Sequence, residues 1–411
     1  MRDATAATPR IGVVLLVPDR WRGIWALRHH VAHRLARHFE VVWVEAARSW
    51  REYWGLARGR DLIAHDIPPD FPGFTVYDPG RWLAKVHKPR VLSNWIHRAR
   101  MQAAVNILRS KGCARIITYV WRPELAWALD AFAADLTCYH IDDEYSFKAS
   151  EQPNDPAEVA LLQRVDQVFI HSHGLLRKKG GINRHTAHVP NGVDYAAYST
   201  PVAEPADLAA IPHPRIGYVG VVKAQLDLQL LRNLARANPE WSFVIVGPRG
   251  FLGDKEGVLN EMSGLPNVHL LGNRAVHALP AYVQGMDVCV MPYEINDYTN
   301  FIYPLKLHEY LATGRPTVAS PIHSVVPFME VVGLATTPPE WQAALENALT
   351  PAARAPEAVR ARREHAAEHD WDLLVEQIAT RLRARLGDPR DGADEASERP
   401  RVGAYAGGRG G

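Results

Sequence analysis

A lysine and a glutamate lie three residues apart in a short segment with clear end signals, residues 304–316, PLKLHEYLATGRP. Pro304 suits the first residue of a helix, Gly314 suits the left-handed residue just past its end, and the final proline prevents continuation. Lys306 and Glu309 therefore share one helical face. The lysine and the free N–H groups of the first turn would attract phosphate, and the carboxylate could accept hydrogen bonds from sugar hydroxyls. The segment predicts recognition of a sugar diphosphate.

The neighbouring residues favour a ligand-binding position for this helix. A strand-like run, 287–292, and a polar loop, 293–300, precede the helix, and a second strand-like run, 317–320, follows it. Such a unit places the start of the helix at the carboxyl end of a parallel sheet, where open α/β sheets bind ligands. An ordinary Lys–Glu surface pair would explain the two charges but not their position. The predicted ligand contacts here are Asn300, Tyr303, Pro304, Lys306 and Glu309.

Residues 304–316 resemble the donor-binding signature of GT-B glycosyltransferases, in the branch of the retaining family-4 and related bacterial enzymes. Glu309 corresponds to the second glutamate of the E-x7-E motif of that branch, and Phe301 occupies the position of the first. The resemblance covers nearly all of residues 11–386. It implies two Rossmann-like α/β domains facing each other across a cleft, a C-terminal helix that crosses back to the first domain, and a nucleotide-diphosphate-sugar as donor.

Further residues of the second half are similar to the donor loops of these enzymes. Gly220 and Gly247 stand at successive strand ends, where a missing side chain lets backbone N–H groups approach phosphate. The Arg and Lys that usually neutralise the diphosphate are replaced by Val221 and Asp227. This departure is familiar in the teichuronic-acid and capsule branch, and it also leaves open a catalytically weakened protein. The remaining candidate cations are Lys223, Arg249 and Lys306.

On the acceptor side, the polar run 139–144, YHIDDE, ends a strand, so its side chains should face the interdomain cleft. The resemblance implies that His140, or Asp142 in the teichuronic-type branch, orients donor or acceptor, with Asp143 beside them. The alternative is that the acidic residues cap the next helix. The loop after the first strand supplies three more acceptor candidates: Arg20, Trp21 and Arg22.

Short apolar strand-like runs alternate with helical patterns along the chain, which favours parallel sheets covered by helices on both faces. An Asn-Gly turn at 191–192 and a Pro- and Ala-rich linker at 199–214 divide this alternation into two halves. We expect an acceptor-side domain at 1–200, a donor-binding domain at 215–370, a crossing helix at 371–386 and a disordered tail at 387–411.

The stretch 79–123 holds ten lysines and arginines and no acidic residue. Between Trp95 and Leu108, apolar residues recur at helical spacing opposite these charges, as in a helix that lies on an acidic surface. Two interpretations remain open. Residues 81–115 could dock on an acidic membrane, or they could form a solvated helix face packed on its own domain.

The composition indicates a globular chain with room for two cores, because 411 residues are 47% hydrophobic. The apolar run 11–18 is too short to span a membrane and is followed by charged residues, so it predicts a buried strand rather than a signal sequence. We expect a cytoplasmic protein, peripheral at the inner face of the cell membrane if the basic stretch docks there, with no nucleic-acid partner.

Neither a metal site nor a cofactor is expected beyond the nucleotide-sugar itself. The three cysteines are odd in number and far apart, which argues against a disulfide framework. His30 and His33 lie one helical turn apart but lack a third ligand at useful spacing, and no Asp-x-Asp motif occurs. This absence agrees with the metal-independent GT-B plan that the resemblance implies.

Together these patterns predict a glycosyltransferase that moves a sugar from a nucleotide-diphosphate-sugar to a saccharide or lipid-linked acceptor, in cell-surface polysaccharide or glycoconjugate biosynthesis. Retention of configuration is implied by the resemblance alone. Two other functions remain open on the same scaffold: a non-hydrolysing sugar-nucleotide epimerase, and a non-enzymatic relic that acts as a scaffold.

Overall fold

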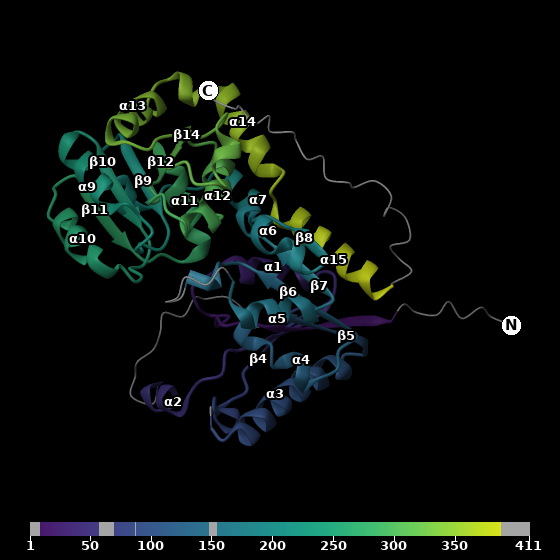
Figure 1. Ribbon diagram of the computed structural model, residues 1–411. Coiled ribbons are helices and arrows are strands. Elements are labelled where there is room, and N and C mark those ends of the chain that lie inside the picture. The colour runs from purple at the N-terminus through teal and green to yellow at the C-terminus, as the bar shows by residue number, and fades with distance from the viewer. Residues whose placement is uncertain (1–8, 57–69, 87, 148–153, 388–411) are drawn as a thin grey trace, which may run out of the picture.

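The computed structural model describes residues 9–56, 70–86, 88–147 and 154–387, and these form two α/β lobes, each built on one sheet (Figure 1). The predicted α/β class and the two parallel sheets are confirmed. The predicted tail, apart from Gly387, lies outside the described residues. Among the described residues, no helix combines the length and the apolar character needed to cross a bilayer.

The first sheet has the strand order β3-β4-β2-β1-β5-β6-β7-β8 and is parallel except for the β3–β4 pair. Its central strands are almost wholly apolar because helices cover both faces. The strands are β1 (Arg10–Leu16), β2 (Glu40–Val44), β3 (Asp70–Phe71), β4 (Phe74–Tyr77), β5 (Cys113–Val120), β6 (Leu136–Ile141), β7 (Gln167–Ile170) and β8 (Thr186–His188).

The second sheet has the order β11-β10-β9-β12-β13-β14, with parallel pairing throughout. In both sheets the first strand of the lobe is internal, and the chain adds strands first on one side of it and later on the other. Each lobe therefore has a crevice at the carboxyl ends of its strands, where the strand order reverses. The strands are β9 (Arg215–Val219), β10 (Ser242–Val246), β11 (Val268–Gly272), β12 (Val288–Met291), β13 (Thr317–Ala319) and β14 (Gly333–Leu334).

Helices cover the two faces of each sheet. The α-helices are α1 (Leu27–Leu35), α2 (Trp50–Leu56), α3 (Arg90–Ser110), α4 (Ala128–Ala131), α5 (Pro156–Arg164), α6 (His173–Lys179), α7 (Tyr195–Ser199), α8 (Ala206–Ala209), α9 (Leu228–Ala237), α10 (Glu256–Ser263), α11 (Leu279–Gln284), α12 (Lys306–Thr313), α13 (Pro338–Ala348), α14 (Pro356–Ala367) and α15 (Trp371–Leu386). Single 3₁₀ turns are η1 (Arg81–Leu83), η2 (Pro123–Leu125), η3 (Tyr145–Phe147), η4 (Gly180–Ile182), η5 (Gly253–Lys255), η6 (Val276–Ala278), η7 (Thr299–Phe301), η8 (Val326–Phe328) and η9 (Ala352–Arg354).

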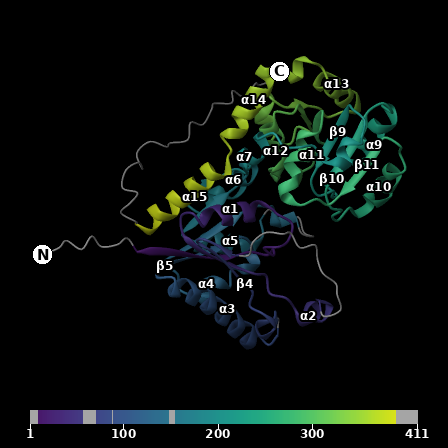
Figure 2. The same cartoon turned by 180° about the vertical axis from the view of Figure 1, so that it is seen from behind.

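The last helix, α15, returns to the first lobe, as the sequence predicts. In Figures 1 and 2 it runs along that lobe, away from the second sheet. Its apolar stripe, which includes Trp371, Val375 and Ile378, is buried in the same core as α1 and strands β1, β2 and β5. The first domain is therefore completed by the C-terminal end of the described chain.

The helix predicted from Pro304 is real, but it begins later. Helix α12 starts at Lys306 because Pro304 and Leu305 form only a turn, in which the Leu307 N–H donates to the Pro304 carbonyl. Its end is as predicted: Gly314 has a φ of 77°, the left-handed conformation that glycine adopts without strain. The free N–H groups of the first turn consequently lie beside Lys306 itself.

Helix α3 packs mainly on its own domain. Ile96, Met101, Val105 and Leu108 are buried, so the second half of the helix belongs to the core under the sheet. Trp95, which the sequence placed on this face, is 59% exposed. Of the two interpretations of the basic stretch, packing on its own domain holds for most of α3.

Candidate functional site

Two glycines and one lysine meet at the carboxyl edge of the second sheet. Gly220, at the end of β9, and Gly247, at the end of β10, have φ of 147° and 144°. A Cβ at Gly220 would collide with the Lys306 side chain, and a Cβ at Gly247 would collide with the Gly220 carbonyl. The Lys306 side chain therefore lies over the end of β9, and the backbone at the end of β10 approaches the backbone at Gly220 closely.

Lys306 and Lys223 form a site of positive charge at this edge. Burial lowers the pKa of Lys223, and the charge of Lys306 lowers it further. The Lys306 ammonium lies 5.2 Å from the centre of the Tyr218 ring. Within the described residues, neither lysine has a carboxylate within ion-pair distance. Two neighbouring cations, offset only at longer range by Glu309 and Asp143, provide an electrostatic setting in which an anion binds favourably.

Glu309 follows one turn later in α12. Burial raises the pKa of Glu309, while the Lys306 charge and a hydrogen bond with the Tyr198 side chain oppose that shift. The carboxylate charge in turn helps to raise the pKa of Tyr218 and Tyr293, two buried phenols. Glu309 is thus a partly desolvated acceptor beside the two lysines, on the face predicted from its spacing.

The loop before α12 touches the first domain. The Tyr298 hydroxyl donates to Oδ1 of Asp143 at 3.0 Å, and the Nδ2 of Asn191 donates to the Tyr303 carbonyl at 2.6 Å. A Cβ on Gly174, at the start of α6, would lie 2.9 Å from the Asn300 carbonyl. Asp143 and Lys223 also interact electrostatically. These contacts hold the loop before α12 against the first domain.

His140 lies at the end of β6 and is 1% exposed. Its Nδ1 is 2.8 Å from the Tyr119 hydroxyl, and its ring stacks on Trp121 with centroids 4.1 Å apart. Its Nε2 is buried and has no hydrogen-bond partner among the described residues. Burial lowers the pKa of His140 well below its usual value, so the ring is neutral at physiological pH.

Asp142 is engaged within the first domain. Its carboxylate binds the Arg28 guanidinium at 2.5 Å, and the Tyr145 hydroxyl donates to its other oxygen at 2.5 Å. Arg28 also pairs with Asp19. The carboxylate is therefore already neutralised, whereas Asp143 is the acidic residue that reaches the second domain.

Several residues predicted from the sequence are buried, exposed or already paired within the protein. Trp21 is 0% exposed in an aromatic core with Trp43 and Phe74, so it is placed in the core rather than on an acceptor surface. Arg20 pairs with Glu45, and Arg22 is exposed. Arg249 is exposed and pairs with Glu256. Tyr303 and Pro304 are buried beneath the helix start, and the Tyr303 hydroxyl is hydrogen-bonded to His308 at 2.8 Å.

No sequence pattern indicated Tyr198, Tyr298 or Arg28, because a lone tyrosine or arginine at irregular spacing carries no pattern. Asn191 was visible only as part of an Asn-Gly turn, which indicates a bend and not its bond to Tyr303. Of the histidine pair, His30 stacks on Trp371 and His33 lies against Phe71. Across the described ranges, no group of three or more potential ligand side chains is placed to hold a metal ion.

Known proteins match this chain in its second domain and in its overall fold. Residues 213–352 match the family model described as "Glycosyl transferases group 1". TuaH of Bacillus subtilis, named as a teichuronic acid biosynthesis glycosyltransferase, is 31% identical over 234 residues, 54% of this chain. The match spans 58% of that relative's length, less than two thirds of it.

Solved structures resemble the chain over most of its length. Anabaena Alr3699/HepE, in complex with UDP and glucose, has a TM-score of 0.65 and 16% identity, covering 91% of this chain and 99% of that one. WaaG, a glycosyltransferase of lipopolysaccharide biosynthesis, has a TM-score of 0.58 and 14% identity, covering 89% and 98%. The predicted GT-B fold is confirmed, and most of the second domain matches the group 1 glycosyltransferase model.

Proposed function

We propose that the protein is a glycosyltransferase that uses a nucleotide-diphosphate-sugar. The main support for this proposal is the pair of lysines, Lys223 and Lys306, at the glycine-lined edge of the domain that matches the group 1 model. Glu309 lies one helical turn away. The pair suits a diphosphate, and the carboxylate suits the hydroxyls of a sugar or ribose. The UDP in the Anabaena structure supports a uridine nucleotide as the first donor to test.

Catalysis in this proposal is mainly electrostatic. As the bond between the sugar C1 and the diphosphate oxygen breaks, negative charge grows on the leaving group and positive charge on the ring. Lys306, Lys223 and the N–H groups at the start of α12 would stabilise the diphosphate without any metal ion. An acceptor hydroxyl in the cleft then bonds to C1 from the face that the diphosphate leaves, and it passes its proton to the departing diphosphate. Because attack and departure share one face, the configuration at C1 is retained.

A panel of nucleotide sugars tests this function directly. We expect one of them to raise the melting temperature of the full chain and to be consumed only when an acceptor is supplied, because bound ligand stabilises the folded state. Product analysis without acceptor separates the epimerase alternative, and any turnover excludes a non-enzymatic scaffold. If no nucleotide sugar or nucleoside diphosphate shifts the melting temperature, the proposed function is wrong.

His140 is expected to act on turnover more than on donor binding. Its unpartnered Nε2 can bind a sugar hydroxyl from the cleft end of β6, a contact that strengthens as the ring flattens in the transition state. We expect His140→Ala to lower kcat by about ten- to a hundredfold while the Kd for the donor changes little. Equal loss of kcat and donor affinity would contradict this role.

Asp142→Asn is the matched control at the same strand end. It removes one of the two carboxylates that pair with the buried Arg28 and leaves only Asp19. A lower melting temperature is therefore expected. If the donor Kd and the kcat of the correctly folded Asp142→Asn protein match those of the wild type, Asp142 is structural.

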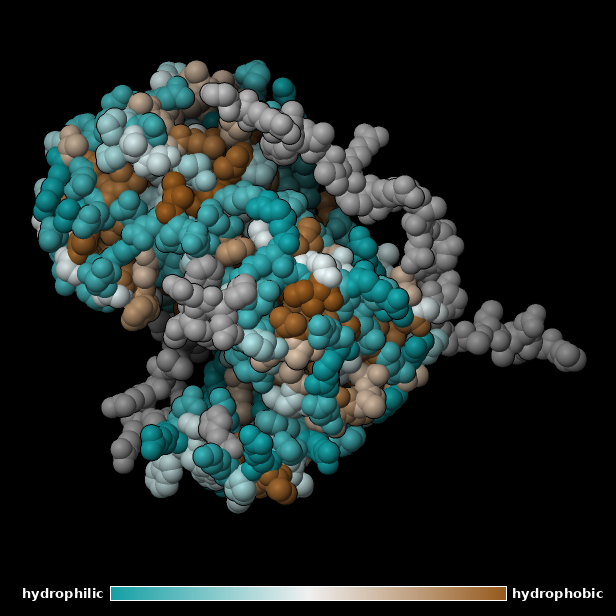
Figure 3. Space-filling view, in the orientation of Figure 1, coloured by the Kyte–Doolittle hydropathy of each residue, from teal (hydrophilic) through white to brown (hydrophobic). Residues whose placement is uncertain are grey.

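We further propose that one tip of the first domain docks on an anionic membrane. Around η1, α2 and the start of α3, large apolar side chains are exposed: Trp50, Trp54, Trp82, Val91, Leu92 and Trp95. Exposed cations surround them: Arg81, Lys85, Lys88, Arg90 and Arg98. In Figure 3 a hydrophobic patch lies at the lower tip of the first lobe, where Figure 1 draws the start of α3. Exposed apolar side chains ringed by cations match a surface that enters an anionic interface.

The cations later in the stretch serve the domain itself. Lys111 pairs with Glu40, Arg115 with Asp135, and Arg109 donates to backbone carbonyls. Within the basic stretch, docking is therefore assigned to residues 81–98 rather than to the whole of 81–115, together with Trp50 and Trp54 of α2. The lipid-linked acceptor would meet the enzyme at this tip.

Vesicle co-sedimentation tests the docking proposal. Each cation near an anionic bilayer is worth about 1 kcal/mol until salt screens it, so wild-type protein should bind anionic vesicles at low salt and leave them at high salt. An Arg81/Lys88/Arg90→Glu variant should remain in solution. The matched control, Arg232/Arg236→Glu in the second domain, should bind like the wild type. Equal partitioning of all three proteins, or binding by none, contradicts docking.

A further inference from the structure

A cavity of about 380 Å³ opens in the first domain, separate from the cluster around Lys306. It lies at the carboxyl ends of β1 and β2 and is bounded by α3 and by the η2 segment that follows β5. The strands that follow β1 in the chain are added first on its β2 side and later, from β5 onward, on its other side. The strand order therefore reverses at β1. Open α/β sheets bind ligands at such a point, and the mechanism proposed above does not use it.

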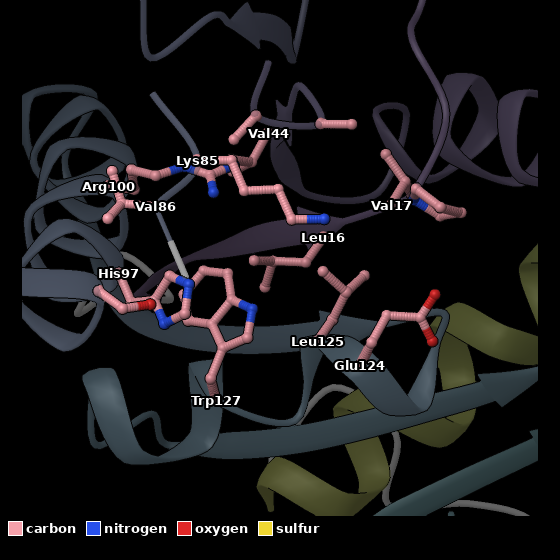
Figure 4. A pocket seen from close by; sticks show the side chains of 14 residues that line it. Leu16, Val17, Val44, Lys85, Val86, His97, Arg100, Glu124, Leu125 and Trp127 are labelled. Atoms are coloured by element: carbon pink, nitrogen blue, oxygen red, sulfur yellow. The ribbon is translucent and has the colours of Figure 1, made fainter. Parts of the chain in front are cut away.

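Basic side chains line one side of this cavity. Figure 4 shows the Lys85 side chain reaching across it, with Arg100 and His97 on one side and Glu124 on the other. Arg100 is 7% exposed, and one of its amino groups donates to the Glu45 carbonyl at 3.0 Å. Its Nε is buried without a hydrogen-bond partner in the described chain. A buried guanidinium with an unused donor is poised to bind an acceptor group.

The positive charge of the cavity is offset only at longer range among the described residues, by Asp78 toward Arg100 and by Glu52 toward Lys85. Among the described residues, no carboxylate lies within ion-pair distance of Arg100 or Lys85, and Glu124 pairs with Arg122 at 3.2 Å. Burial and the charges of Arg100 and Lys85 together lower the pKa of His97 to about 4. Its ring is therefore neutral at physiological pH and can donate one hydrogen bond.

An apolar wall adjoins the basic side chains. The His97 ring stacks on Trp127 with centroids 4.0 Å apart, the Arg100 guanidinium lies 5.6 Å from the centre of the Trp127 ring, and Leu16, Val44 and Leu125 complete the wall. One ligand must therefore present an anionic group and an apolar body together. The cavity also borders the membrane-docking tip, because Lys85 lies two residues after the end of η1 and His97 lies two residues after Trp95 in α3.

We propose that this cavity binds the phosphoryl or diphosphoryl group of an isoprenoid-like lipid carrier, the anionic head of the acceptor, with Lys85 and Arg100 on the phosphate oxygens and the apolar wall against the first part of the chain. The role of this lipid as the acceptor rests on the proposed function. The binding site itself rests on the cavity, its unpaired cations and its apolar wall. Tethering the head here would leave the sugar end of the acceptor to reach the cleft.

Farnesyl diphosphate, inorganic pyrophosphate and farnesol are suitable probes of the full chain. Binding is measured by calorimetry in the presence of saturating UDP, which keeps the probes out of the donor site. We expect farnesyl diphosphate to bind more tightly than pyrophosphate and farnesol to bind weakest. Equal affinity for the two anionic probes would overturn the lipid assignment, and equal affinity of farnesol would overturn the role of charge.

Lys85→Ala should weaken farnesyl diphosphate binding roughly tenfold, since it removes one charge-assisted hydrogen bond from an exposed side chain that the fold does not need. Arg98→Ala is the matched control: it removes an exposed cation of α3 that does not line this cavity. Arg100→Lys serves as a second variant. It keeps the positive charge but loses the planar set of N–H donors of the guanidinium, so it should weaken binding more than Arg98→Ala. Affinities equal to the wild type in both Lys85→Ala and Arg100→Lys would overturn the proposal.

Failure of this site and failure of the proposed function give different results. A protein that transfers sugar but binds none of the anionic probes lacks the lipid-head site and keeps its function. A protein that binds farnesyl diphosphate through Lys85, yet binds no nucleotide sugar, keeps the site and loses the function.

Discussion

Lys306→Ala is expected to slow sugar transfer by about ten- to a thousandfold, the cost of removing one preorganised charge from a developing anion. The side chain crosses the end of β9 at Gly220 and has no carboxylate partner among the described residues, so its charge is available to the leaving diphosphate. Because no native ion pair is broken, the melting temperature without ligand should change little. The measurement is kcat/KM for the nucleotide sugar, together with the Kd for the nucleoside diphosphate.

Arg249→Ala provides the contrast. The sequence placed both cations at the donor site, but Arg249 is exposed and already pairs with Glu256. Its removal should change kcat/KM by less than about twofold, in line with the small contribution of an exposed ion pair. If the two variants lose equal activity, Lys306 contributes no more than Arg249 to stabilising the diphosphate, and its assigned role is wrong.

Glu309→Gln is the second substitution with a large expected effect: a loss of activity of about a hundredfold or more with no loss of stability. The carboxylate is the only charged acceptor that α12 turns toward Lys306 and Tyr198. Glutamine keeps the shape but binds sugar hydroxyls more weakly, since a neutral acceptor makes a weaker hydrogen bond than a charged one. Transfer assays and denaturant unfolding of the same preparations measure both effects.

The pH dependence of stability gives a further check on Glu309. Burial raises its pKa in the folded protein, so between the unfolded and the folded pKa the folded state holds the extra proton. The free energy of unfolding of the wild type therefore falls as pH rises through that interval, and the glutamine variant lacks this fall. At pH 7 to 8 the variant should be at least as stable as the wild type. A clearly less stable variant at that pH would show that Glu309 supports the fold.

Much of the fold was predictable because it depends on local patterns. Buried parallel strands read as short apolar runs, and the stripe of α15 that includes Trp371 and Ile378 repeats at helical spacing. Gly314 ended α12 at the predicted residue because only its conformation was needed. The start of α12 was misjudged because the pattern cannot tell a proline turn from the first turn of a helix.

The site was less predictable because it depends on contacts between distant segments. Tyr298 and Asp143 stand 155 residues apart, and nothing in either segment indicates their hydrogen bond. Trp21 looked like a loop aromatic, yet it lies in the core because Trp43 and Phe74 form a site for it from other strands. The free charge of Lys306 and the paired charge of Arg249 also look alike in a sequence.

The place where α15 returns to the first domain determines how the cleft can open. The chain passes between the lobes twice, and the two passages are joined: the Val193 N–H donates to the His369 carbonyl at 2.9 Å, and the Trp371 N–H donates to the Val193 carbonyl at 3.0 Å. Two adjacent connections that are hydrogen-bonded to each other act as one hinge. The lobes can then rotate about a single line but cannot slide past each other. Asp143 and Tyr298 would then part and meet along one arc, and a donor held by the second lobe would always return to the same register against the first.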